Sequence, residues 1–223
     1  MVELIEGLSV ERVIANLEAV KAEVAEAAAH SGREAGDVEI LAATKYVPCD
    51  ELPVLAAAGI GLVGENRAQD LERKVAVHGH LFTWDFIGRL QSKHVKAVVP
   101  HVRCIHSLAS DSALAALERH ADRAGPGLKV LVEINLAEDP GKAGVAPERL
   151  GEFIERSPVP VAGLMTMPPR ASDPEQSRPW FRRLRELAAT HGLRELSMGT
   201  TQDFAVAVQE GATIVRVGKR LYA

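Results

Sequence analysis

Short apolar runs of strand length alternate with helical segments eight times along this chain of 223 residues. Strands that alternate with helices favour a parallel sheet, because each helix returns the chain to the start of the next strand. Eight such units within about 200–250 residues are typical of a closed (β/α)8 barrel. The predicted strands cover residues 38–44, 62–64, 83–88, 103–107, 128–135, 161–166, 195–198 and 213–217.

One additional helix is predicted before the first strand. Ser9 is a candidate N-cap, Ser31-Gly32 is a candidate stop, and apolar residues recur between them at helical spacing: Val10, Val13, Ile14, Leu17, Val20 and Val24. The main alternative is an open, doubly wound sheet, whose first turn is rich in glycine. The first turn here reads Lys45-Tyr46-Val47-Pro48, which argues against that fold. We therefore predict an α/β protein with a single (β/α)8 TIM-barrel domain over residues 1–223 and an extra N-terminal helix.

The charge and composition argue against several classes of function. The formal net charge is −4, whereas domains that bind nucleic acid are usually basic. No apolar run approaches the roughly 18 residues of a membrane span, and the first residues are acidic where a signal peptide is basic. The two cysteines, Cys49 and Cys104, lie far apart and lack metal or redox spacing. We expect a cytoplasmic protein that binds neither nucleic acid nor membranes.

The first predicted strand leads into a lysine, Lys45, after the apolar run Leu41-Ala42-Ala43-Thr44. In a barrel of this kind, the carboxyl ends of the strands and the loops that follow them build the active site. A lysine amine among apolar neighbours loses hydration, which favours the uncharged, nucleophilic form that Schiff-base chemistry needs. The alternative is an ordinary strand-end lysine that reaches water. On Lys45 alone, this alternative is the better interpretation.

The ends of the seventh and eighth strands favour an anion site. Barrels frequently hold a phosphate on these loops, next to the start of a helix. Hydroxyls, backbone N–H groups, a permissive glycine and a cation are available there: Ser197, Gly199, Thr200, Thr201, Gly218 and Lys219. The alternative is that Thr200 or Thr201 only caps the helix that follows.

Arg216 is a single charge inside the apolar run Thr213–Val217. A buried guanidinium needs a partner. The partner is either a structural carboxylate such as Glu133 or an acceptor atom of a ligand.

Seven motifs follow one another in a characteristic order: Ala43-Thr44-Lys45, Gly64-Glu65-Asn66-Arg67-Ala68-Gln69, Trp84-Asp85-Phe86-Ile87-Gly88-Arg89-Leu90-Gln91-Ser92, Ile105-His106-Ser107, Gly163-Leu164-Met165, Leu196-Ser197-Met198-Gly199 and Val215-Arg216-Val217-Gly218. In this order they resemble the pyridoxal phosphate homeostasis protein family over nearly the whole chain. The chain departs from that pattern at a few positions: Asp85 replaces a histidine, Lys93-His94 replaces Asn-Lys, Thr200 replaces a methionine and Lys219 replaces a small hydroxyl residue.

The resemblance implies a barrel like the N-terminal domain of alanine racemases. It implies that Lys45 carries pyridoxal 5'-phosphate (PLP) as a covalent aldimine. The other implied contacts are Arg216 at the pyridine nitrogen, Asn66 near the ring, and the Ser197–Thr201 loop with Gly218 and Lys219 near the phosphate.

The resemblance also favours a carrier over a catalyst. A permanent cation beside the pyridine nitrogen keeps it unprotonated, which makes PLP a weaker electron sink. Related racemases draw on a second domain for one of their bases, and we expect none here. We therefore expect a monomer that binds, stores or delivers PLP, with PLP-dependent apoenzymes as recipients. Two alternatives stay open: a weak racemase-type PLP enzyme with Tyr46 or His106 as second base, and a PLP-free Schiff-base enzyme in which Lys45 acts on a sugar phosphate.

Overall fold

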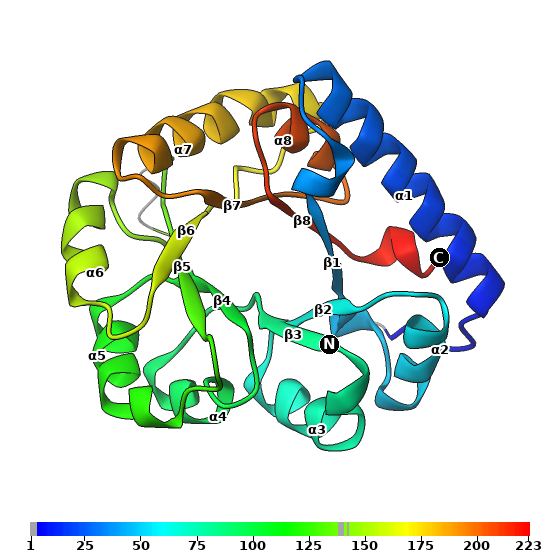
Figure 1. The fold of residues 1–223 in the computed structure, drawn as a ribbon, viewed down its shortest axis with the longest axis horizontal. Helices are drawn as coiled ribbons and strands as arrows, with labels where there is room; N and C mark the ends of the chain where they lie inside the picture. Colours follow the sequence, from blue (N-terminus) through cyan, green and yellow to red (C-terminus); the bar gives the residue numbers. More distant parts are fainter. Residues whose placement is uncertain (1–3, 138–140, 142) are drawn as a thin grey trace.

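The protein is a closed barrel of eight parallel strands in sequential order, in which β8 pairs with β1 (Figure 1). The computed structural model describes residues 4–137, 141 and 143–223; the first residues of the acidic N-terminal segment lie outside this range. The predicted (β/α)8 fold is confirmed. The strands are β1 (Glu39–Ala43), β2 (Leu62–Glu65), β3 (Thr83–Phe86), β4 (Cys104–Leu108), β5 (Lys129–Glu133), β6 (Val161–Met165), β7 (Glu195–Thr200) and β8 (Ile214–Val217).

Helices surround the barrel on the outside (Figure 1). They are α1 (Val10–His30), α2 (Leu52–Ala57), α3 (Ala68–His78), α4 (Val95–Val98), α5 (Asp111–His120), α6 (Leu150–Arg156), α7 (Arg178–Thr190) and α8 (Phe204–Gln209). Several predicted helices are shorter than expected, because their first turn is a 3-10 turn, as at Ser92–His94 before α4. Among the described helices, none is long and apolar enough to cross a membrane.

The extra N-terminal helix α1 lies against α8 and the C-terminal turn Lys219–Leu221 (Figure 1). Ser9 is its N-cap, and the Ser9 hydroxyl accepts a hydrogen bond from the Arg12 N–H, as predicted. The predicted apolar face is confirmed except at Ile14, which is 42% exposed. Because α8 has only six residues, the 21-residue α1 covers a part of the barrel wall that α8 cannot.

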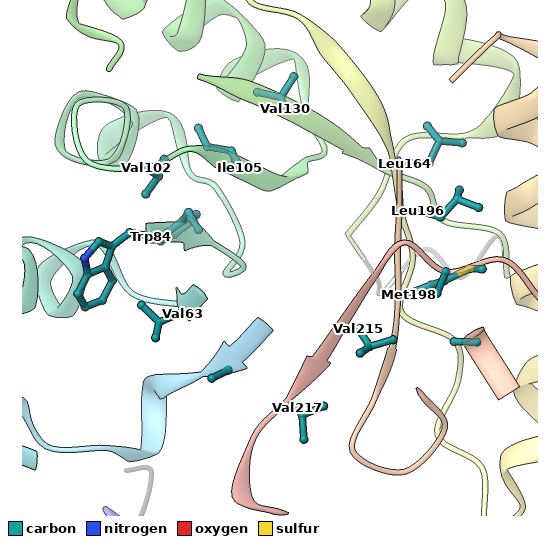
Figure 2. Packing of buried hydrophobic residues seen from close by; sticks show 14 of the residues in the cluster. Val63, Trp84, Val102, Ile105, Val130, Leu164, Leu196, Met198, Val215 and Val217 are labelled. Atoms are coloured by element: carbon teal, nitrogen blue, oxygen red, sulfur yellow. The ribbon is translucent and has the colours of Figure 1, made fainter. Parts of the chain in front are cut away.

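The core has two layers, which follow from the alternation of side chains along each strand. One layer lies between the strands and the helices (Figure 2) and contains Val63, Trp84, Ile105, Val130, Leu164, Leu196, Met198, Val215 and Val217. The other is a small cluster inside the barrel: Leu41, Cys104, Leu131, Met165 and Ile214. The residues between the outward-facing ones therefore point into the barrel. Among them are Asp85, His106, Ser197 and Arg216.

Two strand ends differ from the prediction and move candidate site residues. Strand β1 ends at Ala43, and Lys45 lies in the 3-10 turn Thr44–Tyr46 rather than at the strand end. Strand β7 continues to Thr200 through Gly199, which has a φ of +88°. A Cβ on Gly199 would lie 2.5 Å from the Ala207 Cβ, so glycine allows α8 to pack directly on β7.

Candidate functional site

Two lysine amines share one aromatic ring where the carboxyl ends of β1 and β8 meet. The Lys45 Nζ lies 4.9 Å from the centroid of the Tyr46 ring, and the Lys219 Nζ lies 5.4 Å from it. Within the described part of the chain, neither amine has a hydrogen-bond or ion-pair partner. Gly218 completes the group, because a Cβ there would come within 3.2 Å of the Tyr46 ring. The two amines are therefore available to an anionic or electrophilic ligand.

A buried ion pair fixes the turn that carries Lys45. The Lys74 Nζ lies 2.5 Å from Glu65 Oε1 and donates to the Thr44 carbonyl at 2.8 Å. The Thr44 hydroxyl donates to the same Glu65 oxygen at 2.7 Å. Lys74 does not stand out in the sequence, because a lysine on an amphipathic helix is usually exposed.

The loop after β7 is organised by Asp203. The Thr200 N–H and hydroxyl both donate to Asp203 Oδ1, at 2.7 and 3.1 Å. Asp203 is also the N-cap residue of α8, so the alternative that Thr200 or Thr201 caps this helix is wrong. The Thr201 hydroxyl instead accepts from the Gly218 N–H at 3.2 Å and joins this loop to the end of β8. Thr201, Gly218 and Lys219 thus lie together, whereas Thr200 is turned to Asp203.

Arg216 points into the barrel and is only 7% exposed. Its Nη1 donates to the carbonyl and hydroxyl oxygens of Ser197, and its Nη2 donates to the Thr166 carbonyl at 3.2 Å and to Met167 Sδ at 2.9 Å. Burial lowers the pKa of Arg216 to about 10, against the opposing effect of Glu133 and Asp203. In the described chain no carboxylate forms an ion pair with Arg216, so the structural pair with Glu133 considered from the sequence is not formed.

Ser197 and Gly199 face away from the loop after β7, where they were predicted to contribute to an anion site. Ser197 is fully buried inside the barrel behind Arg216. Gly199 faces α8 through the close approach to Ala207 described above. Asn66 follows the end of β2, is half-buried, and its side chain has no hydrogen bond to the described residues.

Behind Ser197, three buried polar side chains from β3, β4 and β7 are hydrogen-bonded in a row. The His106 Nδ1 lies 2.8 Å from the Ser197 hydroxyl, and His106 Nε2 lies 3.1 Å from Asp85 Oδ2. Asp85 also accepts from Arg103, at 3.2 Å from Nε and 2.8 Å from Nη2. All three side chains, Asp85, His106 and Ser197, are inaccessible to solvent.

Burial and these contacts together shift the pKa values of Asp85 and His106. Although burial works to raise it, the pKa of Asp85 is lowered, because His106 and Arg103 donate to the carboxylate. Burial lowers the pKa of His106, in spite of Asp85. His106 is therefore neutral and Asp85 is ionised near pH 7.

A cavity of about 430 Å³ lies at the carboxyl ends of β5 and β6, and its lining includes Glu133, Thr166, Met167 and Trp180. Thr166 and Met167 also contact Arg216, so this cavity adjoins the guanidinium. Burial raises the pKa of Glu133, while Arg216 and Arg89 oppose this effect. A larger cavity of about 710 Å³ lies between α1 and the start of β1 and contains none of the candidate site residues.

The comparison with known proteins first gives the class. The family of alanine racemase N-terminal domains matches residues 15–223. An alanine racemase from Clostridium difficile shares the fold, with a TM-score of 0.73 at 12% identity over 96% of this chain and 57% of that one. The family match over residues 15–223 and the shared fold thus place the chain in this class of barrel.

The particular family follows from closer relatives. The pyridoxal phosphate homeostasis protein of Aquifex aeolicus is 38% identical over 210 residues, which cover 89% of this chain and 92% of that protein. PipY of Synechococcus elongatus, solved with PLP bound, has a TM-score of 0.80 at 29% identity and covers 95% of this chain and 100% of that one. The chain belongs to the pyridoxal phosphate homeostasis protein family.

Proposed function

We propose that this protein binds PLP at the carboxyl end of the barrel and acts in PLP homeostasis, by storing the cofactor or delivering it. Membership of the family supports this role, as does the PLP-bound structure of PipY, which the chain matches over nearly its whole length. The observation that carries the proposal is the half-buried Lys45 amine, which has no hydrogen-bond or ion-pair partner among the described residues and stands beside a second free cation, Lys219.

Lys45 is the residue proposed to hold PLP covalently. Its uncharged amine would add to the aldehyde carbon of PLP, and loss of one water would leave the Schiff base. The turn Thr44–Tyr46, which the Lys74–Glu65 pair fixes, sets the position of the amine.

The phosphate is proposed to lie against Thr201, Gly218 and Lys219. The Thr201 hydroxyl accepts from Gly218 and still has its own proton to donate. Lys219 adds a positive charge at the same place. Gly218 has no side chain that would keep a ligand away from the Tyr46 ring.

Arg216 is proposed to face the pyridine nitrogen, with Asn66 near the ring. Of its four acceptors, the thioether of Met167 is the weakest, and Met167 is 50% exposed. A pyridine nitrogen would therefore displace the sulfur rather than Ser197 or Thr166. The resulting cation–nitrogen contact keeps PLP unprotonated at the ring, which suits storage better than turnover.

The alternative of a racemase-type enzyme finds less support. His106, one of the two residues considered as second base, is inaccessible to solvent, and both of its ring nitrogens are already hydrogen-bonded, to Asp85 and Ser197. Tyr46 stays available next to Lys45. A single barrel domain, a monomeric state, a cytoplasmic location and PLP-dependent apoenzymes as recipients complete the proposal.

The first experiment is an absorbance spectrum between roughly 300 and 500 nm, where PLP Schiff bases absorb, after PLP is added to wild type, Lys45→Ala and Lys219→Ala. We expect a visible band in wild type and in Lys219→Ala, and none in Lys45→Ala. A band that survives in Lys45→Ala would refute the covalent assignment. No band and no PLP binding in wild type would refute the function and favour the sugar-phosphate enzyme. Rapid exchange of amino-acid α-protons with solvent would instead establish the racemase-type enzyme.

A further inference from the structure

The polar row inside the barrel spans it from one end to the other. It begins at Glu39, whose carboxylate pairs with Arg103 at 2.7 and 3.1 Å near the amino ends of the strands. Arg103 then contacts Asp85, and the contacts continue through His106 and Ser197 to Arg216. Asp85 is fully buried, and Arg103 supplies the cation that a buried carboxylate requires there.

The contacts allow one consistent placement of the protons. An ionised Asp85 only accepts hydrogen bonds, so His106 Nε2 must carry a proton. A neutral imidazole then has an unprotonated Nδ1, which accepts from the Ser197 hydroxyl. The Ser197 oxygen is left to accept from Arg216 Nη1.

We infer that Asp85, His106 and Ser197 are positioning residues for Arg216. Asp85 and His106 fix the direction of the Ser197 hydroxyl. This hydroxyl, together with the Ser197 carbonyl, holds Nη1 and leaves Nη2 turned to Thr166 and Met167. The inference rests on the proposed function, in which Nη2 meets the pyridine nitrogen of PLP.

The substitution Asp85→Asn breaks this arrangement without changing the size of the side chain. The amide has one acceptor oxygen, but the carboxylate receives from Arg103 Nε, Arg103 Nη2 and His106 Nε2. At least one donor must then face the amide nitrogen. If the imidazole moves its proton to Nδ1, both His106 Nδ1 and Arg216 Nη1 donate to the Ser197 hydroxyl oxygen. The Ser197 hydroxyl proton then loses Nδ1 as its acceptor. The hydroxyl must then turn to find an acceptor, and Arg216 Nη1 keeps only the Ser197 carbonyl as an undisturbed partner.

The test is a double-mutant cycle on PLP affinity with wild type, Asp85→Asn, Ser197→Ala and the double variant. We expect each single variant to raise the Kd for PLP about tenfold, the scale of one charge-assisted hydrogen bond. Because both substitutions act through the same Ser197 hydroxyl, their effects should not add. The Kd of the double variant should not exceed the higher of the two single-variant Kd values. The inference would be overturned if the increase in Kd in the double variant equalled the product of the two single increases. It would also be overturned if either single variant bound PLP as tightly as wild type. If Asp85→Asn does not fold, Ser197→Ala decides the outcome alone.

Glu195→Gln is the matched control. It removes the ion pair between Lys129 Nζ and Glu195 Oε1, a 2.5 Å contact between β5 and β7 that is not part of the polar row. We expect it to lower stability and leave the Kd for PLP unchanged. A similar loss of affinity in this control would show that the effect of Asp85→Asn is only structural.

Nitrogen-15 NMR of the His106 ring tests the inference without PLP. The expected wild-type spectrum shows a protonated Nε2 and a bare Nδ1 near pH 7, and Asp85→Asn loses this form. If the spectrum agrees but wild type binds no PLP, the proposed function fails and the proton placement stands. If PLP binds but His106 is protonated at Nδ1, the inference fails and the function stands.

Discussion

Lys74 and Glu65 form an ion pair of 2.5 Å in which the lysine side chain is 3% exposed and the glutamate is fully buried. Both also contact Thr44, the residue before Lys45. Removing one partner of a buried pair leaves an uncompensated charge, which is far more costly than losing an exposed pair. This pair therefore both stabilises the barrel and fixes the position of the candidate Schiff-base lysine.

Replacement of Lys74 tests this link. We expect Lys74→Met to lower the free energy of unfolding by about 3–5 kcal/mol, because the Glu65 carboxylate stays buried without its cation. Lys21→Met is the control, since Lys21 pairs with Glu18 on the surface and both are more than half exposed. Urea denaturation should show almost no change for it. Equal effects of the two substitutions would contradict the account.

Gly199 is predicted to tolerate no side chain. Gly199→Ala adds a Cβ only 2.5 Å from that of Ala207 and also strains a positive φ, so we expect a loss of about 2–4 kcal/mol. Gly192 has a φ of +68° with nothing within 4 Å of its Cβ position. Gly192→Ala should therefore cost only the backbone strain, about 1 kcal/mol. A thermal melt of both variants separates packing from strain, and the account fails if they melt together.

His106 should make stability depend on pH. Burial lowers its pKa in the folded protein below the ordinary value of 6.5. The unfolded chain thus takes up a proton that the folded barrel does not, and stability falls as the pH drops below about 6.5. The expected slope approaches 1.4 kcal/mol per pH unit, about one proton. Asp85 affects stability at a lower pH than His106. The pKa of Asp85 is lowered in the folded protein, so its contribution to stability is lost as the pH falls through that folded-state pKa.

Urea denaturation at several pH values measures this slope. His106→Gln should reduce the slope between about pH 6.5 and 5, whereas the exposed His191→Gln should keep it. A slope that is the same in wild type and His106→Gln would show that another group causes it.

Met167 is predicted to compete with the pyridine nitrogen for Arg216 Nη2. Met167→Leu keeps the size of the side chain but removes the sulfur acceptor, so the free protein loses a contact that the PLP-bound protein does not use. We expect PLP to bind a few times more tightly, as measured by absorbance titration. Weaker binding would show that the thioether supports the bound state instead.

Most of the fold could be predicted from the sequence, because each strand is a short apolar run that is distinct from its amphipathic neighbours. The ends of the elements were less certain. Thr44–Tyr46 and Ser92–His94 form 3-10 turns, which have no apolar period of their own. Ile14 fits the helical spacing of α1 but is exposed, because spacing does not show where the covering surface ends.

The candidate site was partly predictable for a related reason. Arg216 stands out in the sequence as a charge inside an apolar strand. The row of Asp85, His106 and Ser197 does not stand out. Its members come from three different strands, and their proximity depends on the strand register, which the sequence does not show. That register shifts between Ser197 and Thr200 in the pairing of β7 with β8. Ser197 lies inside β7 between the outward-facing Leu196 and Met198, so it points into the barrel rather than into the loop that the sequence suggested.

The pairing of β1 with β8 has a consequence for how the protein folds. Every other pairing in the barrel joins strands that are neighbours in sequence, whereas the β1–β8 pairing joins the first strand to the last and so has by far the largest sequence separation. Lys45 follows β1 and Gly218 follows β8, so the two sides of the candidate lysine site come together only when the barrel closes. A molecule held across the seam would bind only the closed barrel and would, by mass action, lower the population in which the seam is open.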